Sequence, residues 1–186
     1  MATLFRNYVK RFRMHRAVAG WLPEVTLPAG FVLLPWDESH MIPHADITAR
    51  TFRTTIDARL FPNLGRYESC LDLMRVISSH SDFIPESTWL IRYQTEYVAC
   101  IQALGQPGGT GVIQNVAVHP GFQGHGLGKV LLLGAMTGFR SHKMREARLE
   151  VSAKNDRAVR LYHGFGFQQM KTIYRETQTE PSDYTI

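Results

Sequence analysis

The chain has 186 residues, of which 44% are hydrophobic and 20% are charged, as expected for one globular domain with a buried core. Its longest apolar run, Val130–Phe139, is interrupted by glycine and is far shorter than the ~20 residues of a membrane span. The net charge of +5 comes from residues 1–20, which hold five basic and no acidic residues; the other 16 basic residues equal the 16 acidic ones. A generally basic surface for nucleic acid is therefore not indicated.

The basic N-terminal segment, residues 1–25, allows three interpretations. A helix would align the apolar residues Leu4, Phe5, Tyr8, Val9 and Phe12. A strand would align Tyr8, Phe12, Met14 and Val18 with Lys10 and Arg16. An arginine-rich, acid-free amphipathic segment is also typical of organelle transit peptides or membrane-surface anchors, although serine is absent. We expect an ordered segment, at least partly strand, that packs on the domain.

The hydrophobic pattern of residues 26–177 predicts one domain of alternating strands and helices, followed by a polar tail, residues 178–186. The strands are expected at 31–36, 87–93, 97–105, 112–118, 147–153 and 167–177. The helices are expected at 44–55, 67–80, 126–140 and after Asn155, which can serve as an N-cap, with Gly166 as the end. Gln94-Thr95-Glu96 separates two of the strands and looks like a hairpin turn.

The two cysteines, Cys70 and Cys100, lie among apolar neighbours and have no redox or metal-binding spacing. They predict buried, reduced thiols, which suits a cytoplasmic protein. His119 and His125 lack a third ligand at a useful spacing, so no metal site is expected.

A glycine-rich turn joins the strand 112–118 to the helix 126–140, and the strand 147–153 completes a β-α-β unit. The start of such a helix opens at the carboxyl end of the first strand, where free N–H groups form an anion site. Glycines let those N–H groups come close to phosphate oxygens. The turn does not fit the ATP-binding loop, the dinucleotide fingerprint or the nucleophile elbow.

The turn does fit the pattern Q/R-x-x-G-x-G/A, as Gln123-Gly124-His125-Gly126-Leu127-Gly128. A second motif follows in "LEVSAKNDRAVRLYHGFGF" (149–167). In their order and spacing the two motifs resemble those of the GNAT superfamily of acyl-CoA-dependent N-acetyltransferases, and the resemblance covers about residues 30–177. It implies an α/β (α+β) GNAT fold: a mixed, mostly antiparallel sheet of six to seven strands, with a splayed parallel pair at about 112–118 and 147–153 and four helices on its two faces.

The resemblance also implies which residues bind acetyl-CoA as co-substrate. The backbone of the strand would pair with the pantetheine arm, and the turn amides would hold the pyrophosphate. Asn155 would bond near the pantetheine, a role compatible with capping its helix. The implied binding residues are Val116, Ala117, Val118, Gln123, Gly124, His125, Gly126, Leu127, Gly128, Lys129 and Asn155.

Two side chains are implied for catalysis. Tyr162 matches the tyrosine that protonates the departing thiolate, and a phenol with a pKa near 10 keeps its proton at neutral pH. Glu150 matches the base of the branch that acetylates ribosomal-protein N-termini, although a water chain can replace it. The amides Gln114 and Asn115 can orient substrate or water, and residues 51–68 can line the acceptor cleft.

The function implied is transfer of an acetyl group from acetyl-CoA to a primary amine, of a small molecule or a protein, in a ternary complex. The alternatives are a non-catalytic CoA-binding regulatory module and an acyltransferase that uses another acyl group or a hydroxyl acceptor. The expected partners are acetyl-CoA and the amine, without nucleic acid or stable membrane insertion, in a monomer or homodimer.

Overall fold

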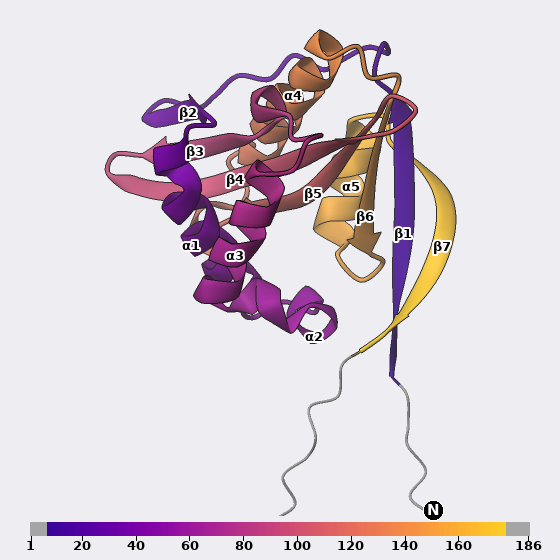
Figure 1. Ribbon diagram of the computed structural model, residues 1–186, viewed down its shortest axis with the longest axis horizontal. Helices are drawn as coiled ribbons and strands as arrows, with labels where there is room; N and C mark the ends of the chain where they lie inside the picture. The colour runs from indigo at the N-terminus through magenta and orange to yellow at the C-terminus, as the bar shows by residue number, and fades with distance from the viewer. Residues whose placement is uncertain (1–6, 178–186) are drawn as a thin grey trace, which may run out of the picture.

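The computed structural model describes residues 7–177, which form a seven-stranded sheet with helices on both faces (Figure 1). The strand order is β2-β3-β4-β5-β6-β1-β7, and every pair is antiparallel except the parallel pair of β5 and β6. The strands are β1 (Tyr8–Ala17), β2 (Phe31–Pro35), β3 (Trp89–Tyr93), β4 (Glu96–Gln106), β5 (Thr110–Val118), β6 (Glu146–Ser152) and β7 (Gln168–Glu176). The predicted fold class is confirmed. The predicted tail, residues 178–186, and Leu4 and Phe5 lie outside the described residues.

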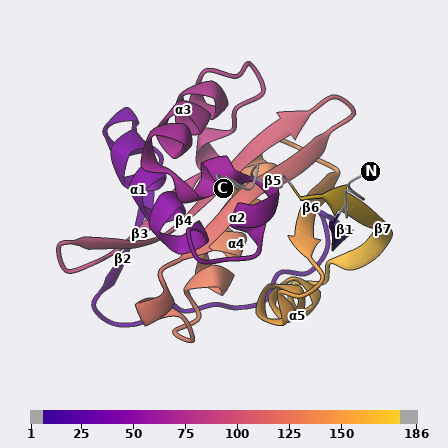
Figure 2. The ribbon, with the colours of Figure 1, turned by 90° about the horizontal axis from the view of Figure 1, so that it is seen from below.

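Figure 2 places α1 and α3 on one side of the sheet and α4 and α5 on the other. The helices are α1 (Met41–Phe52), α2 (Asp57–Leu60), α3 (Tyr67–Ser78), α4 (Leu127–Ser141) and α5 (Asp156–Gly164). The short α2 was not predicted, and α5 ends two residues before Gly166, which instead adopts a φ of +79° in the following turn. Between residues 7 and 177, none of the helices has both the length and the hydropathy to cross a membrane.

The hydrophobic core has a large part beneath α4 and α5 and a smaller part beneath α1. Met14, Leu131, Phe139, Phe165 and Phe167 are fully buried in the large part. The smaller part gathers Ile47, Leu90, Cys100 and Ala117. Both cysteines are buried and unpaired. Burial raises the pKa of the Cys70 thiol to about 11 and that of Cys100 to about 12, so both stay protonated at neutral pH.

Several glycines of the motif region allow close packing of α4. A Cβ on Gly134 would lie 2.9 Å from the indole nitrogen of Trp89, and one on Gly128 would lie 3.0 Å from a methyl of Leu161. A Cβ on Gly111 in β5 would lie 2.5 Å from the ring of Phe139. Of these three glycines, only Gly128 belongs to the turn whose sequence predicts anion binding, and packing explains the lack of a side chain at Gly111 and Gly134.

The N-terminal segment forms a strand inside the sheet, between β6 and β7 (Figure 1). Its register pairs Arg13 with Glu150 of β6 on one side and with Lys171 of β7 on the other. Met14 is fully buried on the face covered by α5, and the alternation of a strand turns Arg11 and Arg13 to the opposite face. The helical interpretation is therefore wrong for residues 8–17.

Strands β5 and β6 diverge soon after they begin to pair. Their parallel register pairs Thr110 with Glu146, Gly111 with Ala147 and Val112 with Arg148. Within residues 7–177, the rest of β5 has a pairing partner only in β4. The free edge of β5 faces the gap, and backbone N–H and C=O groups there are open to a ligand.

Candidate functional site

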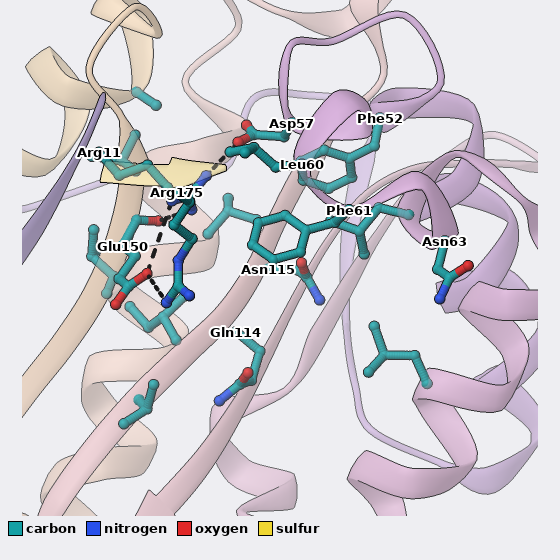
Figure 3. Close-up of a pocket in the computed structure, with 18 of the residues that line it drawn as sticks. Arg11, Phe52, Asp57, Leu60, Phe61, Asn63, Gln114, Asn115, Glu150 and Arg175 are labelled. Atoms are coloured by element: carbon teal, nitrogen blue, oxygen red, sulfur yellow. Dashed lines mark hydrogen bonds and ion pairs between the residues drawn. The ribbon is translucent and has the colours of Figure 1, made fainter. Parts of the chain in front are cut away.

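A cleft of about 910 Å³ opens where β5 and β6 diverge. One wall consists of side chains from β6, β1 and β7, and the opposite wall consists of side chains from α1, α2, α3 and the turns between them (Figure 3). Four of the predicted site residues line this cleft, namely Val116, Glu150, Asn155 and Tyr162. The fold therefore brings together residues from β5, β6 and α5 that the two motifs place apart in the chain.

Tyr162 lies on the inner face of α5 and is only 7% exposed. Its ring contacts the edge of Phe167 with a centroid separation of 6.0 Å. Burial raises the pKa of the Tyr162 phenol, and the negative charge of Asp57 raises it further, against a smaller opposing effect of Arg11. The hydroxyl is thus protonated at any physiological pH, so it can donate a hydrogen bond or a proton but cannot act as a base.

Glu150 is held between arginines of β1 and β7. One carboxylate oxygen accepts from Arg13 Nη2 at 2.7 Å. The other accepts from Arg175 Nη2 at 2.9 Å (Figure 3). Although burial alone would raise it, the pKa of Glu150 is lowered because these two arginines stabilise the charged form. This arrangement suits an anchor for guanidinium groups better than a base that must accept a proton.

A second, buried ion pair joins the N-terminal strand to α2. Arg11 Nη1 donates to Asp57 Oδ1 at 2.5 Å and to Ser152 Oγ at 3.1 Å, while the Ser152 hydroxyl donates to Asp57 at 2.6 Å. The guanidinium also lies 5.3 Å from the ring centroid of Phe61. These contacts hold α2 over the cleft. Sequence reasoning missed Arg11, although strand alternation in the N-terminal segment would have set it apart from the buried Met14.

The remaining polar side chains of the cleft include amides of β5. Gln114 and Asn115 both line the cleft, and both point into it (Figure 3). From residues 51–68, Phe52, Asp57 and Phe61 line it as well. The side chain of Asn155 accepts the N–H of Ala158 at 3.1 Å, so this residue caps α5 at the edge of the cleft.

The glycine turn follows the C-terminal end of β5 and leads into α4. Gly124 and Gly126 have φ angles of +89° and +78°, and a Cβ on either would meet open space. Gly126 is the N-cap of α4, and no side chain caps the first amides of the helix. The N–H of Lys129 donates to the carbonyl of Gly126 at 2.9 Å, which leaves the amides of Leu127 and Gly128 to bind an anion at the positive end of the helix dipole.

Other residues predicted for cofactor binding contribute in different ways. The side chains of Ala117 and Leu127 are buried in the core, so only their backbone could contact a ligand. Gln123 shapes the turn by donating to the carbonyl of Val118 at 3.0 Å and by accepting from Arg157. His125 contacts the carbonyl of Phe122 at 3.1 Å. Val118, Gly128 and Lys129 lie at the end of β5 and in the first turn of α4.

Comparison with known proteins gives independent information on the family and fold of the chain. A model of the acetyltransferase (GNAT) family matches residues 57–167. The chain is 29% identical to the mycothiol acetyltransferase of Thermomonospora curvata over 149 residues, which cover 78% of this chain and 47% of that protein. The chain spans less than half the length of the curated relatives it matches.

Solved structures show the same fold. A GCN5-related N-acetyltransferase from Sphaerobacter thermophilus superposes with a TM-score of 0.69 at 18% identity, covering 92% of this chain and 53% of that one. The PaiA N-acetyltransferase of Thermoplasma acidophilum, solved with coenzyme A, superposes with a TM-score of 0.60 at 14% identity, covering 80% and 99% of the two chains. With the family match spanning more than half of its residues, this chain belongs to the acetyltransferase (GNAT) family.

Proposed function

We propose that this protein transfers an acetyl group from acetyl-CoA to a primary amine, directly and in a ternary complex. The observation that carries the proposal is the free edge of β5, which runs from the open glycine turn to a cleft lined by Tyr162. Family membership supports it, and so does the coenzyme A bound to the relative from Thermoplasma acidophilum.

The residues that would hold acetyl-CoA fit its chemistry. The amides from Gly124 to Gly128 would bind the pyrophosphate at the positive end of α4, where Gly124 and Gly126 leave open space, whereas the Lys129 N–H donates to the Gly126 carbonyl. The backbone of Val116 and Val118 would pair with the amides of the pantetheine arm. Acetyl-CoA, when bound in this way, would supply an activated thioester carbonyl beside the cleft.

Acetyl transfer then forms one C–N bond and breaks one C–S bond. The neutral amine attacks the carbonyl carbon, and a backbone N–H near Val116 stabilises the developing oxyanion. As the C–S bond breaks, Tyr162 donates to the sulfur, and the proton that the amine loses replaces it through water. Glu150 is bonded to two arginines and is therefore a poor candidate to orient the amine or that water. Gln114 and Asn115, which line the cleft, take this role.

Direct transfer is favoured over an acyl-enzyme intermediate on the cysteines. Neither Cys70 nor Cys100 lines the cleft, both are buried, and burial raises the pKa of each thiol above its usual range. Two buried, unpaired thiols also suit a reducing compartment, and we propose the cytoplasm as the location of the protein.

A thiol-release assay tests the function. We expect acceptor-dependent release of CoA from acetyl-CoA when the full chain is screened against small primary amines and peptides with free N-termini, above the rate without acceptor. Binding of CoA with no thiol release on any amine would instead support a regulatory module. Release from longer acyl-CoA thioesters alone would indicate a different acyl group.

A further inference from the structure

One wall of the cleft is rich in arginine, and the opposite wall is largely apolar, although Asp57 and Asp72 also line it. Among the side chains that the structure describes, four arginines line the cleft, from β1, β6 and β7: Arg11, Arg13, Arg148 and Arg175. The opposite side carries apolar side chains from the region of α1 to α3: Phe52, Leu60, Phe61, Leu73 and Val76. In Figure 3, Glu150 and Arg175 lie on one side of the cleft and Phe52 and Phe61 lie on the other.

The arginines differ in how their charge is balanced. Arg11 has its own buried carboxylate, Asp57, and Arg148 pairs with Glu146 at 2.6 Å. Arg13 and Arg175 instead share one carboxylate, that of Glu150, which Arg11 Nε also approaches at 3.9 Å. Two guanidinium groups on one carboxylate carry a net positive charge, and both line the cleft.

These two arginines are also accessible and held in place. Their side chains are 41% and 46% exposed, whereas the side chain of Arg11 is 8% exposed. Arg175 donates to Glu150 through Nη2, which leaves the other side of its fork for another anion, whereas Arg13 donates through both Nε and Nη2 and offers the remaining N–H groups of its two terminal nitrogens. Glu150 fixes the orientation of both groups, which reduces the entropy lost when a ligand binds.

We propose that the acceptor is a primary amine that also carries an anionic group, and that Arg13 and Arg175 bind this group; the proposal rests on the proposed function. The anion lies against the basic wall, and apolar parts of the acceptor lie against Phe52 and Phe61. A planar guanidinium fork fits a carboxylate or a phosphate.

The position of the two arginines in the chain indicates that they set specificity. The family match covers residues 57–167, which include Glu150 but neither Arg13 nor Arg175. Both arginines come from strands that flank this shared region, β1 before it and β7 after it. Recognition of the acceptor therefore depends on segments outside the shared domain.

Matched pairs of amines test the proposal by thiol release. Phenylalanine against phenylalaninamide probes a carboxylate, and phosphoethanolamine against ethanolamine probes a phosphate, each compared at equal concentrations of neutral amine. We expect the anionic member of at least one pair to be the better substrate. Arg175→Gln should raise the KM for that anionic amine at least tenfold and leave its kcat within about twofold, and the KM and kcat for the neutral amine of the pair should not change. Arg92→Gln, on β3 and outside the cleft lining, is the matched control and should change neither.

A binding measurement stays informative even if none of these amines is acetylated. With CoA present, inorganic phosphate or benzoate is titrated into protein labelled with ¹⁵N-arginine, and the arginine Nε–H signals are followed by NMR. We expect saturable shifts at Arg13 and Arg175, and none at Arg92. Shifts without thiol release on any amine would count against the proposed function and still support the anion subsite. Signals unmoved by both anions, or equal use of the charged and neutral amines, would overturn this proposal.

Discussion

Replacing Tyr162 by phenylalanine should lower turnover by ~10²–10⁴-fold, the usual contribution of a general acid, with little change in acetyl-CoA affinity. The substitution removes only the hydroxyl, and the ring keeps its contact with Phe167. Because the pKa of Tyr162 is raised, the wild-type hydroxyl carries its proton throughout the neutral range. Steady-state kinetics at saturating acetyl-CoA measure the effect.

Tyr174→Phe is the matched control, since Tyr174 is exposed on β7 and does not line the cleft. It should retain wild-type turnover. If Tyr162→Phe, shown by circular dichroism to be folded, also turns over at nearly the wild-type rate, then water or another group protonates the thiolate, and Tyr162 contributes only packing.

Arg11→Met should reduce the free energy of unfolding by ~3–5 kcal/mol, because it leaves the buried Asp57 carboxylate without its cation. Arg13→Met, two residues away on the same strand, should cost less than ~1 kcal/mol, because that arginine is half exposed. Urea denaturation of the two variants measures the difference. A similar loss in both would show that the Arg11–Asp57 pair has no special part in joining β1 to α2.

The double variant Arg11→Met/Asp57→Asn separates the ion pair from general packing. With the buried charge removed, much of the stability lost in Arg11→Met should return. If the double variant is instead as unstable as the sum of the two single variants, the loss comes from packing of the long side chains rather than from an uncompensated carboxylate.

Local patterns in the sequence predict most of the elements and the capping residue of α5. Asn155 caps α5 by accepting the N–H of Ala158, three residues further along the chain, so its role depends only on neighbours in the sequence. The hairpin at Gln94–Glu96 and the start of α4 after Gly126 are local in the same sense. The resemblance of two motifs then identifies the parallel pair of strands and places Tyr162 at the gap between them.

Long-range pairing could not be predicted in this way. The partners of Arg11 lie 46 and 141 residues away, and no periodicity indicates that the first strand enters the sheet between β6 and β7. The same limitation applies to Glu150. Its place in the motif suggested a base, whereas arginines from β1 and β7, which the motif does not contain, lower its pKa.

The central claim is that the glycine turn and the free edge of β5 hold acetyl-CoA beside the cleft, and calorimetric titration of acetyl-CoA into three proteins tests it most directly. Gly126→Val should weaken binding by ~1–3 kcal/mol, roughly 5- to 150-fold in Kd, because its side chain blocks the amides at the start of α4. Gly108→Val is the matched control, since Gly108 also has a positive φ, +84°, and open surroundings, but lies in the β4–β5 turn. The account predicts wild-type affinity for Gly108→Val and weakened affinity for Gly126→Val. Equal affinity of all three folded proteins, or no binding by the wild type, would contradict it.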